Sequence, residues 1–180
     1  KEYDIAIKLN PNNPYYHFVK GNVLSKLRRY DEALKEYDIA ISLDPNDPRY
    51  HFIKGYVLSE LDRYDDAIKE YDKAIALDPN NPDFHFGKGR ALSELGHHDE
   101  ALKEYDIAIK LNPNNPYYHF VKGNVLSKLR RYDEALKEYD IAISLDPNDP
   151  RYHFIKGYVL SELDRYDDAI KEYDKAIALD

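Results

Sequence analysis

Histidines recur at a fixed spacing along this chain, and a regular array of imidazoles is the first feature that could do chemistry. A neutral imidazole is a common metal ligand, and it can also act as a general base. Metal–nitrogen bonds are about 2.0–2.1 Å long, whereas packed helices lie about 8–10 Å apart, so histidines on successive helices cannot easily share one ion. We therefore interpret these side chains as buried, hydrogen-bonded structural residues. The array consists of His17, His51, His85, His119 and His153.

The two other histidines, His97 and His98, are adjacent in sequence. They stand where the neighbouring repeats carry Arg-Tyr, in a segment that we expect to be a surface turn. Short histidine clusters can also bind metal adventitiously, and that is the alternative interpretation.

Paired carboxylates, such as Asp65 with Asp66 and Glu70 with Asp72, are the other candidates for catalysis. Acid–base work by two carboxylates needs a shared, desolvated cleft. Here the acids fall at expected helix starts and on an outer helix face, where capping and solvation explain them. The sequence contains no nucleophile–histidine–acid set, phosphate-binding glycine loop or metal-ligand signature. We expect no enzymatic activity, no cofactor and no metal.

The composition favours a folded chain with a solvated, acidic surface. Of the 180 residues, 43% are hydrophobic, and 34 acids against 26 bases give a formal charge of −8. This charge argues against nucleic acid, whose phosphates require basic surface. The sequence lacks cysteine, any apolar run of about 18 residues and a signal-peptide pattern at its start. We therefore expect a cytoplasmic protein that does not act at a membrane.

An internal repeat of 34 residues organises the sequence. Residues 1–78 and 103–180 are identical, which implies either a recent gene duplication or deliberate concatenation. We number repeat positions from the proline that starts each unit: Pro14, Pro48, Pro82, Pro116 and Pro150. The chain then divides into a single array, with a partial repeat at 1–13, full repeats at 14–47, 48–81, 82–115 and 116–149, and a nearly complete last repeat at 150–180.

Each repeat predicts two helices. Asn or Asp before the starting proline is an N-cap signal, so the first helix should run from that proline to the leucine at position 14. The second helix should begin near the Asp at position 18 and stop before the proline at position 32. Helical spacing places Tyr16, Gly21 and Leu24 on one face of the first helix in the first full repeat, together with Val23 and Leu27. On the second helix Ala33, Leu34, Tyr37, Ala40 and Ile41 share a face.

The period of 34, with Gly at position 8, Ala at 20 and 27, an aromatic at 24 and Pro at 32, resembles the tetratricopeptide repeat. The resemblance covers essentially the whole chain. It implies an all-α fold, a right-handed α-solenoid of stacked antiparallel helix pairs with eleven helices. The sequence departs from the family pattern with His at position 4, Lys at 7, Leu at 11 and Tyr at 24.

The resemblance implies that positions 2, 5, 9, 12 and 13 of the first helices line a concave groove. Position 5 is always Phe and position 12 always Ser, whereas positions 2, 9 and 13 change chemistry between repeats. Apolar anchors among varied polar groups are typical of a recognition surface for a protein or peptide. The stripe residues predicted to contact a partner are Tyr15, Phe18, Asn22, Lys26, Arg49, Phe52, Tyr56, Glu60, Asp83, Phe86, Arg90, Glu94, Tyr117, Phe120, Asn124, Arg151, Phe154 and Tyr158.

Two alternatives to this recognition surface stay open. Each Phe could instead pack sideways on the next first helix and have a purely structural role. The array could also self-associate head to tail, because the sequence opens at position 22 and closes at position 31, which would leave apolar faces uncovered. The family's lysine-based clamp for acidic tails is not expected, because Phe occupies every position 5.

Overall fold

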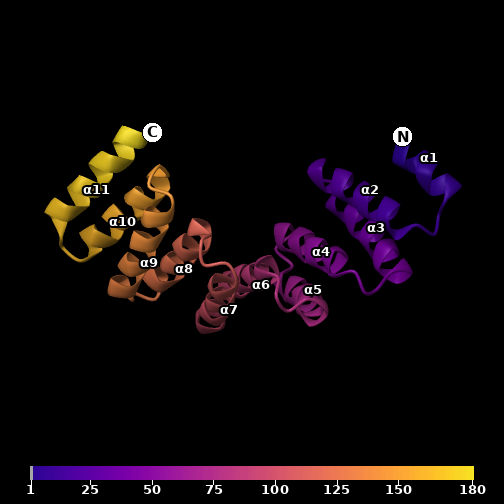
Figure 1. Ribbon diagram of the computed structural model, residues 1–180, viewed down its shortest axis with the longest axis horizontal. Coiled ribbons are helices and arrows are strands. Elements are labelled where there is room, and N and C mark those ends of the chain that lie inside the picture. Colours follow the sequence, from indigo (N-terminus) through magenta and orange to yellow (C-terminus); the bar gives the residue numbers. More distant parts are fainter. Residues whose placement is uncertain (1) are drawn as a thin grey trace. The chain divides into compact units, whose positions relative to one another are not determined.

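The computed structural model describes the backbone of residues 2–180 and the side chains of residue 5 and residues 7–180 (Figure 1). Lys1, the first residue of the predicted partial repeat, lies outside them. The described residues form eleven α-helices and no strand, which confirms the predicted all-α class. The helices are α1 (Glu2–Leu9), α2 (Pro14–Lys26), α3 (Tyr30–Leu43), α4 (Pro48–Glu60), α5 (Tyr64–Leu77), α6 (Pro82–Glu94), α7 (His98–Leu111), α8 (Pro116–Lys128), α9 (Tyr132–Leu145), α10 (Pro150–Glu162) and α11 (Tyr166–Leu179).

The chain forms two compact units, residues 1–97 and 98–180. In the first unit α2 pairs with α3 and α4 with α5, while α1 packs on α2, α4 on α3, and α6 on both α4 and α5. In the second unit α8 pairs with α9 and α10 with α11, while α7 packs on α8 and α9 on α10. Within each unit, the first helices that have a second helix after them pair with it, and successive pairs stack.

The first helices begin as the cap signal predicts. The backbone N–H of Tyr15 donates to Asn13 Oδ1 at 3.0 Å, and that of Arg49 donates to Asp47 Oδ1 at 2.9 Å. Proline follows each cap, where its missing N–H costs no helical hydrogen bond. These helices end one residue earlier than predicted, because the leucine at position 14 is the C-cap.

A left-handed residue at position 15 terminates each complete first helix. Arg28 has φ 59°, Asp62 has φ 56° and Gly96 has φ 80°. The N–H of Arg29 donates to Leu24 O at 2.9 Å and that of Arg28 donates to Ser25 O at 2.8 Å, the pair of bonds that defines a Schellman motif. The chain is thereby turned into the second helix, which begins one residue before the predicted Asp.

Small residues let the two helices of a pair approach closely. Ala33 and Ala40 of α3 are fully buried, as is Tyr37. A Cβ added to Gly21 would lie 2.5 Å from the Tyr37 ring, so the ring occupies the space that any larger residue would need. The predicted core face is thus confirmed for the second helix. The predicted core face of the first helix is confirmed in α4. In α2, by contrast, Val23 and Leu27 are exposed, and only α1 precedes this helix.

Candidate functional site

The position-5 phenylalanines form a ladder of ring contacts. Phe18 lies 6.1 Å from Tyr37 in its own repeat and 4.9 Å from Tyr50 in the next, between ring centroids. Phe52 makes the equivalent contacts with Tyr71 at 5.9 Å and Phe84 at 5.0 Å. These rings therefore pack sideways between repeats, as the structural interpretation of the stripe expects, while keeping part of their surface accessible.

The same ladder occurs in the second unit, where Phe120 contacts Tyr139 at 6.3 Å and Tyr152 at 5.0 Å. Two members differ from this half-buried pattern. Phe86 is 9% exposed, whereas Phe154 is 59% exposed and contacts only Tyr173 among the ring pairs that the described residues form. Identical residues at position 5 therefore present very different amounts of surface.

A cleft of about 450 Å³ lies in the first unit, where α4, α5 and α6 meet. Seven of the predicted stripe residues line it, three from α4 and four from α6: Phe52, Tyr56, Glu60, Asp83, Phe86, Arg90 and Glu94. The structure thus brings together the predicted stripe residues of the second and third repeats, with the exception of Arg49.

Gly87 opens the floor of this cleft. A Cβ at Gly87 would lie 2.9 Å from Tyr71 Cε1 and 3.4 Å from Phe52 Cε2, so the bare backbone is what leaves room for these rings. All four other full or nearly full repeats carry a branched aliphatic residue at this position, namely Val19, Ile53, Val121 and Ile155. The third repeat is therefore shaped differently from its neighbours at one defined point.

Carboxylates dominate the rim of the cleft. The lining residues include four acids and a single base, Arg90, so their formal charges sum to −3. The hydroxyl of Tyr64 donates to Asp62 Oδ1 at 2.7 Å, and this bond is the main reason that the pKa of Tyr64 is raised to about 12. Burial, followed by the charge of Glu60, raises the pKa of Tyr56. The rim thus combines neutral phenols with exposed negative charge.

Ser59 also lines the cleft and lies on the stripe, although it is not among the predicted contacts. Five further lining residues lie outside the stripe: Asp62, Tyr64, Tyr71, Gly87 and Ala91. Tyr64 and Tyr71 belong to a second helix, which the first-helix wheel does not include. The sequence does distinguish Gly87, because every other repeat has Val or Ile at this position.

Other stripe residues form polar contacts within their own repeat or with the cap residue that ends the preceding repeat. Asn22 accepts a hydrogen bond of 2.9 Å from the Tyr37 hydroxyl, and Asn124 accepts the equivalent bond from Tyr139. Arg49 forms an ion pair of 2.5 Å with the N-cap residue Asp47, and Arg151 repeats this pair with Asp149. Four further stripe residues are exposed: Tyr15, Lys26, Tyr117 and Tyr158.

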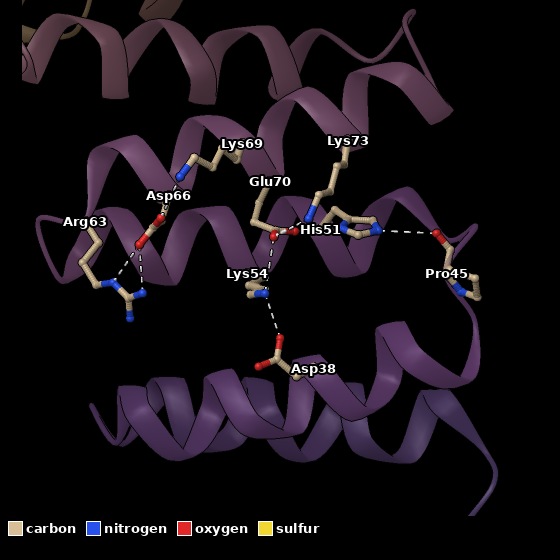
Figure 2. A network of polar contacts seen from close by, with 9 residues as sticks. All are labelled: Asp38, Pro45, His51, Lys54, Arg63, Asp66, Lys69, Glu70 and Lys73. Carbon is tan, nitrogen blue, oxygen red and sulfur yellow. Dashed lines mark hydrogen bonds and ion pairs between the residues drawn. The ribbon is translucent and has the colours of Figure 1, made fainter.

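The histidine array is buried and hydrogen-bonded, which confirms its structural interpretation. All five members are 6–7% exposed. Figure 2 shows the second repeat, where His51 Nδ1 lies 2.7 Å from Glu70 Oε2 and His51 Nε2 lies 3.4 Å from Pro45 O. The same 2.7 Å contact to a glutamate occurs at His17, His119 and His153. Each of these four rings therefore connects the two helices of its repeat and also contacts a proline carbonyl of the preceding loop.

Lysine at position 7 extends this network between repeats. Lys54 Nζ lies 3.3 Å from Glu70 Oε1 and 2.7 Å from Asp38 Oδ1 on α3, and Lys73 contacts Glu70 at 2.9 Å (Figure 2). Burial raises the pKa of the Glu70 carboxyl, but hydrogen bonds from His51 and Lys73 outweigh it, so the net pKa is lowered. The charged carboxylate is thus the form that the fold stabilises.

Neither a metal cluster nor a membrane-spanning helix is found in the part of the chain that the structure describes. No group of three or more His, Cys, Asp or Glu side chains there is arranged to hold an ion. The described helices are all too short or too polar to cross a bilayer.

Comparisons with known proteins agree with this architecture. Two sequence models described as tetratricopeptide repeat match the chain, one over residues 1–48, 18–82 and 120–180 and the other over residues 58–125. A search of curated proteins gave no match.

Solved structures of similar fold include two kinds of helical repeat protein. A crystal structure of MamA is 22% identical with a TM-score of 0.83, covering 92% of this chain and 91% of that one. MamA from Desulfovibrio magneticus is 20% identical with a TM-score of 0.85, covering 92% and 94%. YrrB, described as a TPR protein with an unusual peptide-binding site, is 25% identical with a TM-score of 0.78, covering 99% and 92%.

Proposed function

Because the chain belongs to the tetratricopeptide repeat family, we propose that it is a non-catalytic scaffold that binds a peptide or protein segment along the stripe of its first helices. Members of this family typically mediate protein–protein interactions. The cleft formed by α4, α5 and α6 is the proposed centre of binding. The remaining stripe residues are proposed contacts on the surface of the unit to which each belongs.

The cleft itself is the observation that carries this proposal. Its volume lies in the range of ligand sites, about 300–1,000 Å³, and is enough for one or two side chains of a bound segment. Aromatic residues supply apolar contact area at its floor, and exposed charged residues surround them. Buried aromatic anchors with a polar rim are typical of the energetic centre of an interface.

The similarity to YrrB supports the same function, since that protein is described as having a peptide-binding site. The lining of the cleft differs from that of an enzyme active site. It contains no combination of a nucleophile, a histidine and an acid such as covalent catalysis uses.

A peptide selection tests the proposal directly. A random twelve-residue display library is panned against the immobilised chain, and enriched peptides are titrated by calorimetry. Tyr56→Ala should weaken a selected peptide at least tenfold, because its ring lines the cleft. Tyr166→Ala removes a tyrosine at the repeat position of Tyr64 in the other unit, and it should change affinity less than twofold. Failure to enrich any peptide, or equal binding by the cleft variant, would reject the cleft as the binding site.

A further inference from the structure

The charge of the α4–α6 cleft has a consequence for its partner. We propose that the segment bound there is cationic and carries an Arg or Lys beside an aromatic or aliphatic side chain. This inference rests on the proposed function and adds the chemistry of the ligand. The basic group would meet the acidic rim, and its apolar neighbour would occupy the floor above Gly87.

Two glutamates at the same repeat position carry most of the argument. Glu60 on α4 and Glu94 on α6 both occupy position 13, on helices that pack together, and both are exposed side chains of the cleft. Carboxylates on neighbouring helices can both contact one basic group. An arginine is well suited to this, because its planar guanidinium binds carboxylates in a bidentate manner and stacks on aromatic rings.

The aromatic lining supports the same partner. Four aromatic side chains line the cleft besides Phe86: Tyr56 is exposed, Phe52 and Tyr64 are half-buried, and Tyr71 is buried. A cation over an aromatic face gains about 0.5–1 kcal/mol at exposed sites. An acidic partner would instead face four carboxylates against one guanidinium.

The acidic rim is a local feature rather than a property of every repeat. Position 13 is Lys26 in the first full repeat and Lys128 in the fourth. The third repeat adds Asp83 and Glu94, so the negative side chains concentrate where Gly87 also opens the floor. The chain thus combines a shape change and a charge change in the same cleft.

The last repeat supplies a matched control. Residues 150–180 repeat the sequence of 48–78, so Glu162 stands in the same local sequence as Glu60. Glu162 is not among the residues that line the α4–α6 cleft. A charge reversal at Glu162 changes the net charge of the protein as one at Glu60 does, and it leaves the cleft intact.

Three synthetic peptides test the inference by isothermal titration calorimetry. The first is acetyl-GSRFRLSG-amide, and in the other two both arginines are replaced by glutamine or by glutamate. The arginine peptide should bind at least tenfold more tightly than the glutamine peptide, and the glutamate peptide should bind more weakly still. Affinity for the arginine peptide should fall as salt rises, because exposed charge contacts are screened.

Variants then locate the interaction. Glu60→Lys with Glu94→Lys should weaken the arginine peptide at least tenfold, whereas Glu162→Lys should change it less than twofold. The lysines are compatible with the fold, because Lys26 and Lys128 occupy the same repeat position. Circular dichroism confirms that each variant is folded before titration.

The outcomes separate this inference from the function on which it rests. Equal or tighter binding of the glutamine or glutamate peptide overturns the cationic preference, as does an equal loss with Glu162→Lys. If the arginine peptide fails to bind while display-selected peptides bind through Tyr56, the cationic partner is wrong and the groove function stands. If neither kind of peptide binds, both fail.

Discussion

At the residue scale, two of the positions that depart from the family pattern, 4 and 7, form one connected network. His51 and Lys54 on α4 both contact Glu70 of α5, and Lys54 also reaches Asp38 of the preceding repeat. His at position 4 and Lys at position 7 are therefore explained together by the glutamate at position 23. Polar groups buried in this way stabilise a fold only when their partners are present.

Removal of the central carboxylate should be costly. Glu70→Gln should lower the free energy of unfolding by about 1–3 kcal/mol, because it weakens hydrogen bonds to buried His51 and removes the charge that pairs with Lys54 and Lys73. Urea unfolding followed by circular dichroism measures the change. Glu32→Gln, which alters an exposed pair with Arg29, is the control and should cost no more than about 1 kcal/mol. Equal effects of the two substitutions would contradict the role of the network.

The lowered pKa values of Glu70, Glu138 and Glu172 predict the acid limb of stability. A carboxyl whose pKa is lower in the folded state contributes its full stability above its unfolded value, near 4.5, and loses it as the pH falls through the folded pKa. The melting temperature should therefore decrease steadily below about pH 4.5. The decrease should be smaller in Glu70→Gln, and an identical slope in the two proteins would contradict this assignment.

At the element scale, the turn between helices is built around a left-handed residue. Arg28, Asp62, Arg130 and Asp164 adopt positive φ at position 15, and only the third repeat has glycine there, Gly96. A non-glycine residue in this region is strained by about 1–2 kcal/mol through contact of Cβ with the backbone.

Glycine at this position should relieve the strain. Arg28→Gly should raise stability by up to about 1 kcal/mol, since the gain in the folded state is offset by the greater entropy of glycine in the unfolded chain. Gly96→Ala should lower stability by about 1 kcal/mol, although a Cβ at Gly96 would contact nothing within 4 Å. Urea unfolding of both variants checks the opposite signs, and changes of the same sign would contradict the conformational explanation.

The sequence predicted which segments are helical more accurately than it predicted where those helices end or which residues line the cleft. Cap signals such as Asn13-Pro14 fixed the starts of the first helices, and the spacing of Ala33, Tyr37 and Ala40 predicted a buried face. The predicted ends of the first helices lie one residue beyond the observed ends. Arg28 and Asp62 adopt the left-handed conformation that ends these helices, and neither residue type marks a helix end in the sequence. For the cleft, a single-helix wheel found Tyr56 and Arg90 and could not include Tyr64 and Tyr71, which reach it through packing of a second helix.

At the scale of the whole molecule, identical sequence occupies different surroundings. Phe52 and Phe154 stand in identical stretches, yet Phe52 packs on Phe84 of α6, whereas Phe154 is mostly exposed. Neighbouring repeats therefore decide what each stripe residue can offer. The terminal helices expose apolar side chains such as Leu9 and Ile177, and self-association through them stays a prediction.

Ion pairs join successive repeats at equivalent places. The position-7 lysine contacts an aspartate on the preceding second helix at 2.7–2.8 Å in Lys54–Asp38, Lys88–Asp72, Lys122–Asp106 and Lys156–Asp140. A double-mutant cycle with Lys54→Met and Asp38→Asn should give a coupling energy of about 0.2–1 kcal/mol that shrinks in high salt, because the aspartate is exposed. A coupling energy of zero at low salt would show that apolar contacts alone join the repeats.

The most direct test of the proposed binding site is a single change that fills the cleft and matches its neighbours. Gly87→Ile gives the third repeat the residue that Ile53 and Ile155 place at the same position, and its side chain would displace the Tyr71 ring and occupy the floor. Calorimetry with a display-selected peptide should then show at least a tenfold loss of affinity in a protein that still unfolds cooperatively. Unchanged affinity in the folded variant would contradict binding in the α4–α6 cleft.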